Sequence, residues 1–314
     1  MKFIIGIDLG ATFIKIGLLG KDYEIIRKRR LYTQDFKDKE SLIERIVEEI
    51  KAILQDRKID TKDVLGIGIG VPGPVDFKRG LVHYFPNIKG FKNTLLGEIF
   101  QRKTGIKTYI DNDTNLMGLA ESRFGRGKNF KSSVYLTLGT GVGGAVFVEE
   151  RIYRGKNFTA GEIGHIPINE KGPLCNCGGR ACLERYIGNR YVLAKARRIF
   201  KDRSLTLEVL SEIARRKDKR AISIWKDMGR KLGIALTGIV NFFNPECIIV
   251  GGGLSGAGKV LFSEIRKTIR LRAMAPSVKG LKISKAKLKD AGIIGAALLV
   301  PTPLRLKTVI NDRR

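Results

Sequence analysis

Four side chains that can bind a metal ion lie in one short stretch of the sequence. Three of the four cysteines, Cys175, Cys177 and Cys182, fall within eight residues, and His165 precedes them by ten positions. Three thiolates and one imidazole form a ligand set typical of tetrahedral zinc. A disulfide is the alternative, but three clustered cysteines leave one unpaired, and a reducing compartment disfavours disulfides. The spacing therefore favours structural zinc, whereas Cys247, inside an apolar run, is interpreted as ordinary core.

A second group with possible chemistry is a glycine turn between two apolar runs near the start of the chain. It reads Asp8-Leu9-Gly10-Ala11-Thr12-Phe13-Ile14-Lys15. Such a turn can present the Gly10 backbone, Thr12 and Lys15 to phosphate oxygens, with Asp8 available to Mg²⁺. A plain β-hairpin turn is the alternative and explains the same glycine.

Two further glycine loops occur later in the chain. The first, Leu138 to Gly144, contains Gly139, Thr140, Gly141 and Gly143, and bare glycine backbone lets a phosphate approach closely. A strand rather than a helix is predicted to follow it, which excludes a dinucleotide-binding fingerprint. The second consists of Gly251, Gly252 and Gly253, between an apolar strand and a helix, and it can admit an adenine and ribose.

The periodicity of apolar residues predicts an order of elements that repeats. We expect strands at 3–9, 12–19, 24–32, 64–71, 107–110, 133–138, 144–148 and 247–250. We expect helices at 39–57, at 113–124 and from about 258. The recurring layout of strand, glycine loop and strand predicts two related lobes. We expect an N-terminal α/β lobe at 1–114, completed by about 295–314, and a C-terminal lobe at 115–294 that includes the zinc-binding segment 161–184.

Composition limits the class of protein and its partners. The chain has 314 residues, 43% of them hydrophobic and 29% charged, which is the balance of a globular protein. No apolar run is long enough to span a membrane, and the N-terminus enters a strand directly, so we expect a cytoplasmic protein. The net charge of +28, from 59 Lys and Arg against 31 Asp and Glu, attracts polyanions. Because these residues are scattered along the sequence, we expect nucleic acid not to be a partner.

The three glycine motifs, in this order and with Asn112-Asp113 between the first two, resemble those of the actin, hexokinase and heat-shock-chaperone ATPase superfamily. Two further segments resemble those of one branch, the ROK family of repressors, uncharacterised reading frames and sugar kinases. They are Gly161-Glu162-Ile163-Gly164-His165 and the run from Cys175 to Glu184. The resemblance covers essentially the whole chain. It implies an α/β protein with a two-lobed, actin-like ATPase (ribonuclease H-like) fold and a cleft between the lobes.

The resemblance also implies a role for individual residues. Phosphoryl transfer needs one carboxylate to orient the attacking hydroxyl and accept its proton, and Asp113 is the matching general base, with Asn112 orienting the sugar. An Asp at a helix start can instead act only as a cap, and Asp111 is a weaker candidate base. The residues that match the family's sugar site are Gly73, Asn87, Asn112, Asp113, Glu162, His165 and Glu184. Glu184 can alternatively begin a helix, and Asn87 can be a turn residue.

The activity that the resemblance implies is transfer of the γ-phosphoryl group of ATP to the 6-hydroxyl of a hexose, with Mg²⁺ and Zn²⁺ as cofactors. Glucose is the expected substrate, and N-acetylmannosamine, N-acetylglucosamine, mannose and fructose remain open. Ala11 and Phe91 depart from the family's commoner residues, which leaves the choice of sugar open. A sugar-responsive transcription factor is the alternative of another class, although a winged helix-turn-helix needs about 60 to 80 residues ahead of Asp8. The family resemblance further predicts a homodimer or homotetramer.

Overall fold

The computed structural model describes residues 2–85 and 88–302, and these residues form two compact units. Unit 1 consists of residues 2–124, 154–159 and 288–302, and unit 2 of residues 125–153 and 160–287. The helix at 113–124, which the predicted lobe boundary divides, lies in unit 1. Asn87, a predicted sugar contact, lies outside the described residues.

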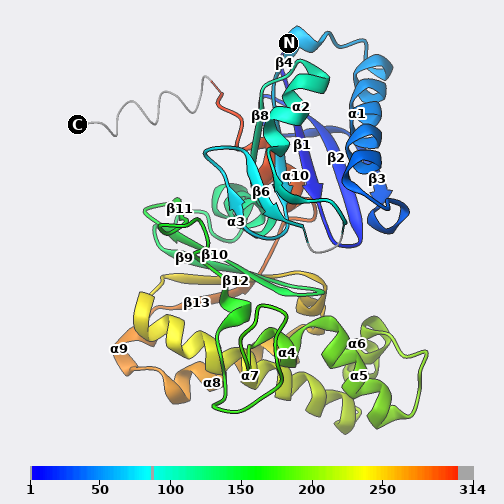
Figure 1. Cartoon of the computed structure of the whole chain (residues 1–314). Coiled ribbons are helices and arrows are strands. Elements are labelled where there is room, and N and C mark those ends of the chain that lie inside the picture. Colours follow the sequence, from blue (N-terminus) through cyan, green and yellow to red (C-terminus); the bar gives the residue numbers. More distant parts are fainter. Residues whose placement is uncertain (1, 86–87, 303–314) are drawn as a thin grey trace. The chain divides into compact units, whose positions relative to one another are not determined.

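Unit 1 is built on a five-stranded mixed sheet (Figure 1). Its strands, in spatial order, are β3 (Ile25–Tyr32), β2 (Phe13–Gly20), β1 (Phe3–Leu9), β4 (Val64–Val71) and β8 (Thr108–Asn112). β3, β2 and β1 pair antiparallel, while β1, β4 and β8 pair parallel. β1, β2 and β3, which are consecutive in the sequence, therefore form an antiparallel meander at the positions where strands were predicted.

The two faces of this sheet are covered by different helices. On one face Ile5, Ile7 and Leu9 share a buried cluster with the apolar side of α1 (Lys39–Asp56), which begins at the side-chain cap Asp38. On the other face Ile4 and Leu19 pack with α10 (Ala291–Ala297). α10 lies so close that a Cβ on Gly6 would stand 2.2 Å from the carbonyl oxygen of Ile293. Glycine at position 6 is therefore required by packing.

The remaining elements of unit 1 connect these strands. They are the small sheet strands β5 (Val75–Asp76), β6 (Leu81–Tyr84) and β7 (Lys92–Thr94), and the helices α2 (Leu96–Thr104) and α3 (Asp113–Phe124). α3 follows β8 without a loop, so the end of a parallel strand and the start of a helix meet between Asn112 and Asp113.

Unit 2 repeats the sheet of unit 1. Its strands, in spatial order, are β11 (Arg151–Tyr153), β10 (Val142–Val148), β9 (Ser133–Leu138), β12 (Cys247–Gly251) and β13 (Lys282–Lys285). The first three again pair antiparallel, and β9, β12 and β13 pair parallel. This common order and orientation agree with the duplication predicted from the two strand, glycine-loop, strand patterns.

A group of helices packs on the sheet of unit 2 (Figure 1). They are α4 (Glu184–Ile187), α5 (Asn189–Phe200), α6 (Leu207–Arg215), α7 (Lys219–Phe243), α8 (Lys259–Arg272) and α9 (Ala275–Val278). Val134, Leu136 and Leu138 of β9 join one buried cluster with Trp225 of α7 and Ile265 of α8. Among the described residues, no helix is long and apolar enough to cross a membrane.

Candidate functional site

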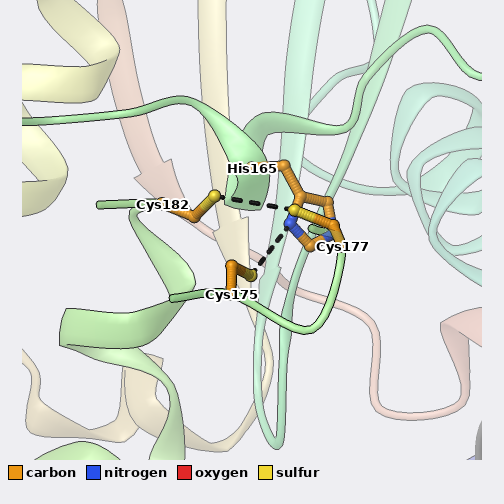
Figure 2. Close-up of side chains that lie close together, drawn as sticks. All are labelled: His165, Cys175, Cys177 and Cys182. Carbon is orange, nitrogen blue, oxygen red and sulfur yellow. Dashed lines mark hydrogen bonds between the residues drawn. The ribbon is translucent and has the colours of Figure 1, made fainter. Parts of the chain in front are cut away.

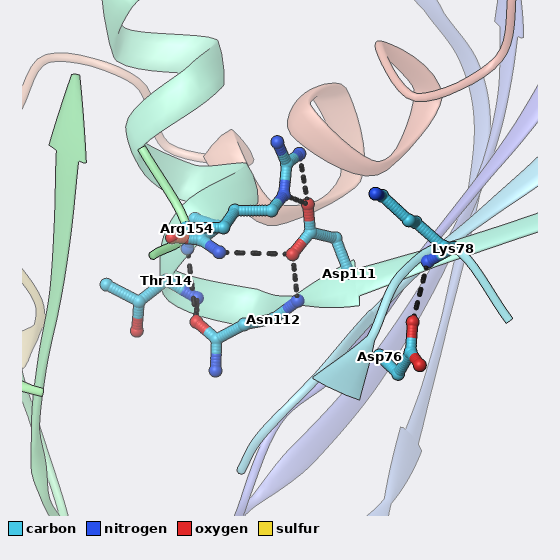
Figure 3. A network of polar contacts seen from close by, with 7 residues as sticks. Asp76, Lys78, Asp111, Asn112, Thr114 and Arg154 are labelled. Carbon is cyan, nitrogen blue, oxygen red and sulfur yellow. Dashed lines mark hydrogen bonds and ion pairs between the residues drawn. The ribbon is translucent and has the colours of Figure 1, made fainter. Parts of the chain in front are cut away.

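The junction between β8 and α3 contains a dense set of hydrogen bonds around Asp111 and Asn112 (Figure 3). The Asn112 side-chain oxygen accepts from the backbone N–H groups of Thr114 (2.9 Å) and Asn115 (3.2 Å), so Asn112 caps α3. Its Nδ2 donates to the carbonyl oxygen of Gly73 at 3.1 Å. Asp113 Oδ1 accepts from the N–H of Thr114 at 2.7 Å. The junction thus brings together three of the predicted sugar-site residues, Gly73, Asn112 and Asp113.

Asp111, directly before this pair, is a buried carboxylate with several donors around it. Its Oδ1 accepts from the N–H of Asn112 (2.7 Å) and from Asn115 Nδ2 (3.0 Å). Its Oδ2 forms an ion pair with Arg154, whose Nε and Nη2 lie 2.9 and 2.5 Å away. With its oxygens engaged in this way and only 2% of its surface exposed, Asp111 is suited to positioning the junction.

Arg154 is a residue that the sequence analysis missed. It follows β11 and opens the short segment 154–159, which belongs to unit 1 although unit 2 supplies the chain on either side. Its guanidinium also lies 4.1 Å from the centre of the Phe77 ring, and Phe77 packs edge-on against Phe158. A buried Asp beside the predicted base could have suggested a cationic partner, but nothing in the sequence identifies Arg154 among the 59 basic residues.

The first glycine motif forms a tight hairpin between β1 and β2, as the plain structural alternative proposed. Gly10 N–H donates to the Phe13 carbonyl at 3.0 Å, and the Thr33 hydroxyl donates to the Gly10 carbonyl at 2.8 Å. Thr12 is exposed at the turn. The hairpin does not exclude phosphate binding, because its tip remains accessible.

Asp8 is the chemically unusual residue of this turn. Its side chain is almost fully buried; Oδ2 accepts from Lys15 Nζ at 3.2 Å, and Oδ1 has no hydrogen-bond partner within the described part of the chain. Burial raises the pKa of Asp8, while the neighbouring Lys15 ammonium opposes that rise. A buried carboxylate oxygen without a donor is suited to a bound cation.

The second glycine motif is the β9–β10 hairpin, and it contacts a predicted sugar ligand. Glu184 Oε2 accepts from the N–H of Val142 at 2.9 Å, and a Cβ on Gly141 would stand 2.5 Å from the same oxygen. Thr140 is exposed at the tip, whereas Gly143 is paired with Thr137 inside the strands. The glycine at 141 therefore makes room for the Glu184 carboxylate, a contact that sequence spacing did not predict.

The third motif, Gly251 to Gly253, lies against this hairpin. Gly252 has a φ of +80°, and a Cβ there would stand 2.3 Å from the Leu138 carbonyl oxygen. Gly253 has open space on its Cβ side and begins a short turn that leads into α8. The predicted adenosine-binding loop and the predicted phosphate-binding hairpin are thus neighbours within unit 2.

The histidine and the three clustered cysteines converge on one point (Figure 2). The ligand atoms of His165, Cys175, Cys177 and Cys182 all lie within 4.8 Å of one another. His165 Nδ1 faces Cys175 Sγ at 3.7 Å, Cys177 and Cys182 sulfurs are 3.7 Å apart, and all three thiols are free. The arrangement opposes the disulfide alternative, and four such atoms converging on one point suit a tetrahedral metal site.

Glu162 lies next to this cluster. Its Oε2 is 3.8 Å from His165 Nε2, the ring nitrogen that does not face the thiols. Burial raises the pKa of Glu162; nearby His165 opposes the rise and the Glu184 carboxylate adds to it. Three predicted sugar-site residues, Glu162, His165 and Glu184, are therefore close enough to interact within unit 2.

Comparisons with known proteins agree with these motifs. The model of the ROK family matches residues 4–302. Glucokinase of Thermotoga maritima is 33% identical over 95% of this chain and 96% of its own length. The xylose repressor of Caldicellulosiruptor bescii is also 33% identical, over 93% of this chain and 76% of its own length. A ROK family glucokinase from Streptomyces griseus, solved with glucose and AMPPNP, superposes with a TM-score of 0.81 at 29% identity, covering 95% of this chain and 99% of that one.

Proposed function

Because this chain is a member of the ROK family with an actin-like ATPase fold, we propose that it is an ATP-dependent sugar kinase. The reaction is transfer of the γ-phosphoryl group of ATP to the 6-hydroxyl of a hexose, with glucose as the first candidate. The observation that carries this proposal is the β8–α3 junction. At this junction a carboxylate, Asp113, stands at the start of α3. The two residues before it, Asp111 and the helix cap Asn112, end β8 and are both fixed by hydrogen bonds.

The proposed mechanism assigns one task to each group of residues. Asn112 and Asp113 orient the sugar. Asp113 accepts the proton of the 6-hydroxyl group while the oxygen of that hydroxyl attacks the γ-phosphorus. The bond between the γ-phosphorus and the oxygen that joins it to the β-phosphate breaks, and ADP leaves with that oxygen. Glu162, His165 and Glu184 pair with the other sugar hydroxyls, since a site built around hydroxyls rejects analogues that lack them. Asn87 is proposed as a further contact.

The nucleotide is assigned to the three glycine motifs. The turn around Gly10, with Thr12 and Lys15, and the hairpin Gly139–Gly143, with Thr140, each offer backbone and hydroxyl groups to phosphate oxygens. The loop Gly251–Gly253 offers space to adenosine. Asp8 fits a role in holding Mg²⁺ because its Oδ1 is buried and without a partner among the described residues. When bound, Mg²⁺ neutralises phosphate charge during transfer.

Zinc fits the four-residue cluster, and we propose it as a structural ion held by His165, Cys175, Cys177 and Cys182. Bound there, it stabilises the loop 161–184 without taking part in the transfer. Through His165 and Glu162 the cluster adjoins the proposed sugar contacts. The ion would thus shape the sugar site indirectly.

The test of the proposal is a coupled ADP-release assay with Mg-ATP across glucose, N-acetylglucosamine, N-acetylmannosamine, mannose and fructose. We expect turnover on one of these sugars and its loss in Asp113→Asn. Asn87→Ala is expected to raise the KM for the sugar and leave the KM for ATP unchanged. Absence of turnover on all five sugars by folded, metal-loaded protein would refute the kinase function.

A second candidate function, a sugar-responsive regulator, is favoured by the similarity to the xylose repressor over most of the chain. It predicts sugar binding without phosphoryl transfer. Calorimetric binding of a sugar by protein that shows no ADP release would favour this candidate.

A further inference from the structure

The positive charge of unit 2 is concentrated in the segment 259–287, which contains α8, α9 and β13. Its 29 residues contain nine Lys and Arg against one acid, Glu264, and all nine basic side chains are exposed. Their net charge of +8 compares with +28 for all 314 residues. Less than a tenth of the sequence therefore carries more than a quarter of the net charge.

This segment differs from α1, another strongly charged element, in the pairing of its charges. On α1, basic and acidic side chains pair, as Arg45 does with Glu48 and Glu49. Within the described residues, by contrast, no carboxylate lies at ion-pair distance from Lys267, Arg270, Lys282 or Lys285. Proteins adapted to high temperature carry additional charged residues of both signs, arranged in ion-pair networks. Such adaptation does not explain a segment whose charges are almost all positive. Unpaired like charges instead indicate an anionic partner.

The fold brings these charges together on α8 and on the edge strand beside it. Lys259, Arg266, Lys267 and Arg270 recur at helical spacing on one side of α8, where a groove of about 470 Å³ is lined by Ser263, Arg266, Lys267, Arg270 and Leu271. Arg266 Nη2 donates to the Ile283 carbonyl of β13 at 2.7 Å, which places this side of α8 beside the edge strand of the sheet. Lys282 and Lys285 belong to that strand, which Figure 1 labels β13. Lys285 pairs in register with Val250, on the side of the sheet that α8 covers, and Lys282 pairs with Cys247, on the other side of this edge strand. We call these six basic residues of α8 and β13 the basic face.

We propose that the basic face binds the phosphate backbone of double-stranded nucleic acid without sequence preference. From Lys259 to Arg270 the helix spans about 16 Å, at about 1.5 Å per residue. A duplex carries about one phosphate per 1.7 Å of its axis, so the face meets several phosphates at once.

The residue types on the segment select this kind of partner. Single strands are held by exposed aromatic rings, but the one aromatic residue of 259–287, Phe262, is 6% exposed. Base edges are read in part by Asn and Gln side chains, and the segment contains neither. What remains is the set of cations that neutralises a phosphate backbone.

The test measures binding of a mixed-sequence, fluorescein-labelled 20-base-pair DNA duplex by anisotropy between 50 and 200 mM salt. The variant Lys267→Gln, Arg270→Gln, Lys282→Gln, Lys285→Gln removes four charges from the basic face. The matched control, Lys128→Gln, Arg198→Gln, Lys219→Gln, Lys226→Gln, removes one Arg and three Lys that are also exposed, elsewhere in unit 2. Circular dichroism melting of all three proteins establishes that each is folded.

We expect the wild-type protein to bind, the variant of the basic face to bind at least about tenfold more weakly at 100 mM salt, and the control to change by less than about threefold. The slope of log K against log salt falls by up to about 3.6 units in the variant of the basic face, at about 0.9 per phosphate contact. Equal losses in the two variants, or no binding by the wild-type protein at 100 mM salt, would overturn the proposal. So would tighter binding of the single strand, or of inorganic polyphosphate at equal phosphate concentration.

Discussion

Replacement of Arg154 by glutamine removes the cation from the buried carboxylate of Asp111. The pair is well formed, with both Nε and Nη2 of Arg154 directed at Oδ2 of a side chain that is 2% exposed. Removing one partner of a buried ion pair costs about 3–5 kcal/mol. We expect the lower end, about 3 kcal/mol, because the Arg154 side chain is 20% exposed and Asp111 keeps its bonds from Asn112 and Asn115.

This loss corresponds to a fall in melting temperature of about 6–12 °C, at about 2–4 °C per kcal/mol for a unit of this size. Differential scanning fluorimetry measures the shift. Loss of the ion pair also loosens Asp111 and thereby the neighbouring Asn112 and Asp113. The ADP-release assay is therefore expected to show a lower kcat with a smaller change in the KM for ATP. The matched control is Arg154→Gln combined with Asp111→Asn, which removes both charges and keeps hydrogen-bonding groups.

The double variant is expected to recover more than half of the lost stability, since the cost lies in the unpaired charge rather than in the absent pair. A melting temperature of Arg154→Gln within about 1 °C of wild type, equivalent to less than about 0.5 kcal/mol, would refute the reasoning. A double variant that is less stable than the single one would refute it equally.

Three further predictions concern the other parts of the site. Glu184→Ala removes a proposed sugar contact and also the acceptor of the Val142 N–H. It is expected to raise the KM for the sugar and to raise the KM for ATP about tenfold, for a charged hydrogen bond of about 1.5 kcal/mol, while Glu184→Gln retains most affinity for ATP; an unchanged KM for ATP would contradict the role of this hydrogen bond. Burial raises the pKa of Asp8, so the folded protein holds the proton of this carboxyl group more tightly than the unfolded chain does. The folded protein therefore loses stability as the pH rises through the raised pKa. Asp8→Asn should therefore match or exceed the wild-type melting temperature at pH 7 while losing Mg-dependent turnover, and a marked fall in melting temperature would count against this. Metal analysis should find about one zinc per chain, and Cys177→Ser or chelation should lower both zinc content and melting temperature; metal-free protein that melts like the untreated one would contradict the structural role.

The sequence predicted best what depends on local pattern. Ile5, Ile7 and Leu9 alternate with residues of the other face, so β1 could be identified directly, and the apolar spacing from Leu42 to Leu54 identified α1. The convergence of His165 with the cysteines was also predicted, because three clustered thiols with a nearby imidazole have few other uses. These signals lie within short stretches of chain.

Contacts between distant parts of the sequence could not be predicted in this way. Arg154 and Asp111 are 43 residues apart, and Glu184 and Val142 are 42 apart, so only the folded chain pairs them. The concentration of basic residues in 259–287 is present in the sequence, although the sequence analysis treated the basic residues as scattered; the contact of Arg266 with the Ile283 carbonyl, which brings α8 beside β13, is seen only in the folded chain. The homo-oligomer implied by the family resemblance stays a prediction.

The central claim, phosphoryl transfer with Asp113 as the base, is tested most directly by product analysis beside a binding measurement. Protein incubated with Mg-ATP and glucose is examined by ³¹P NMR, and glucose binding by wild type and Asp113→Asn is measured by calorimetry. The account predicts a glucose 6-phosphate signal from wild type, none above the uncatalysed level from Asp113→Asn, and measurable glucose binding by both. Glucose binding with no phosphorylated sugar from the wild-type protein, or undiminished product from Asp113→Asn, would contradict it.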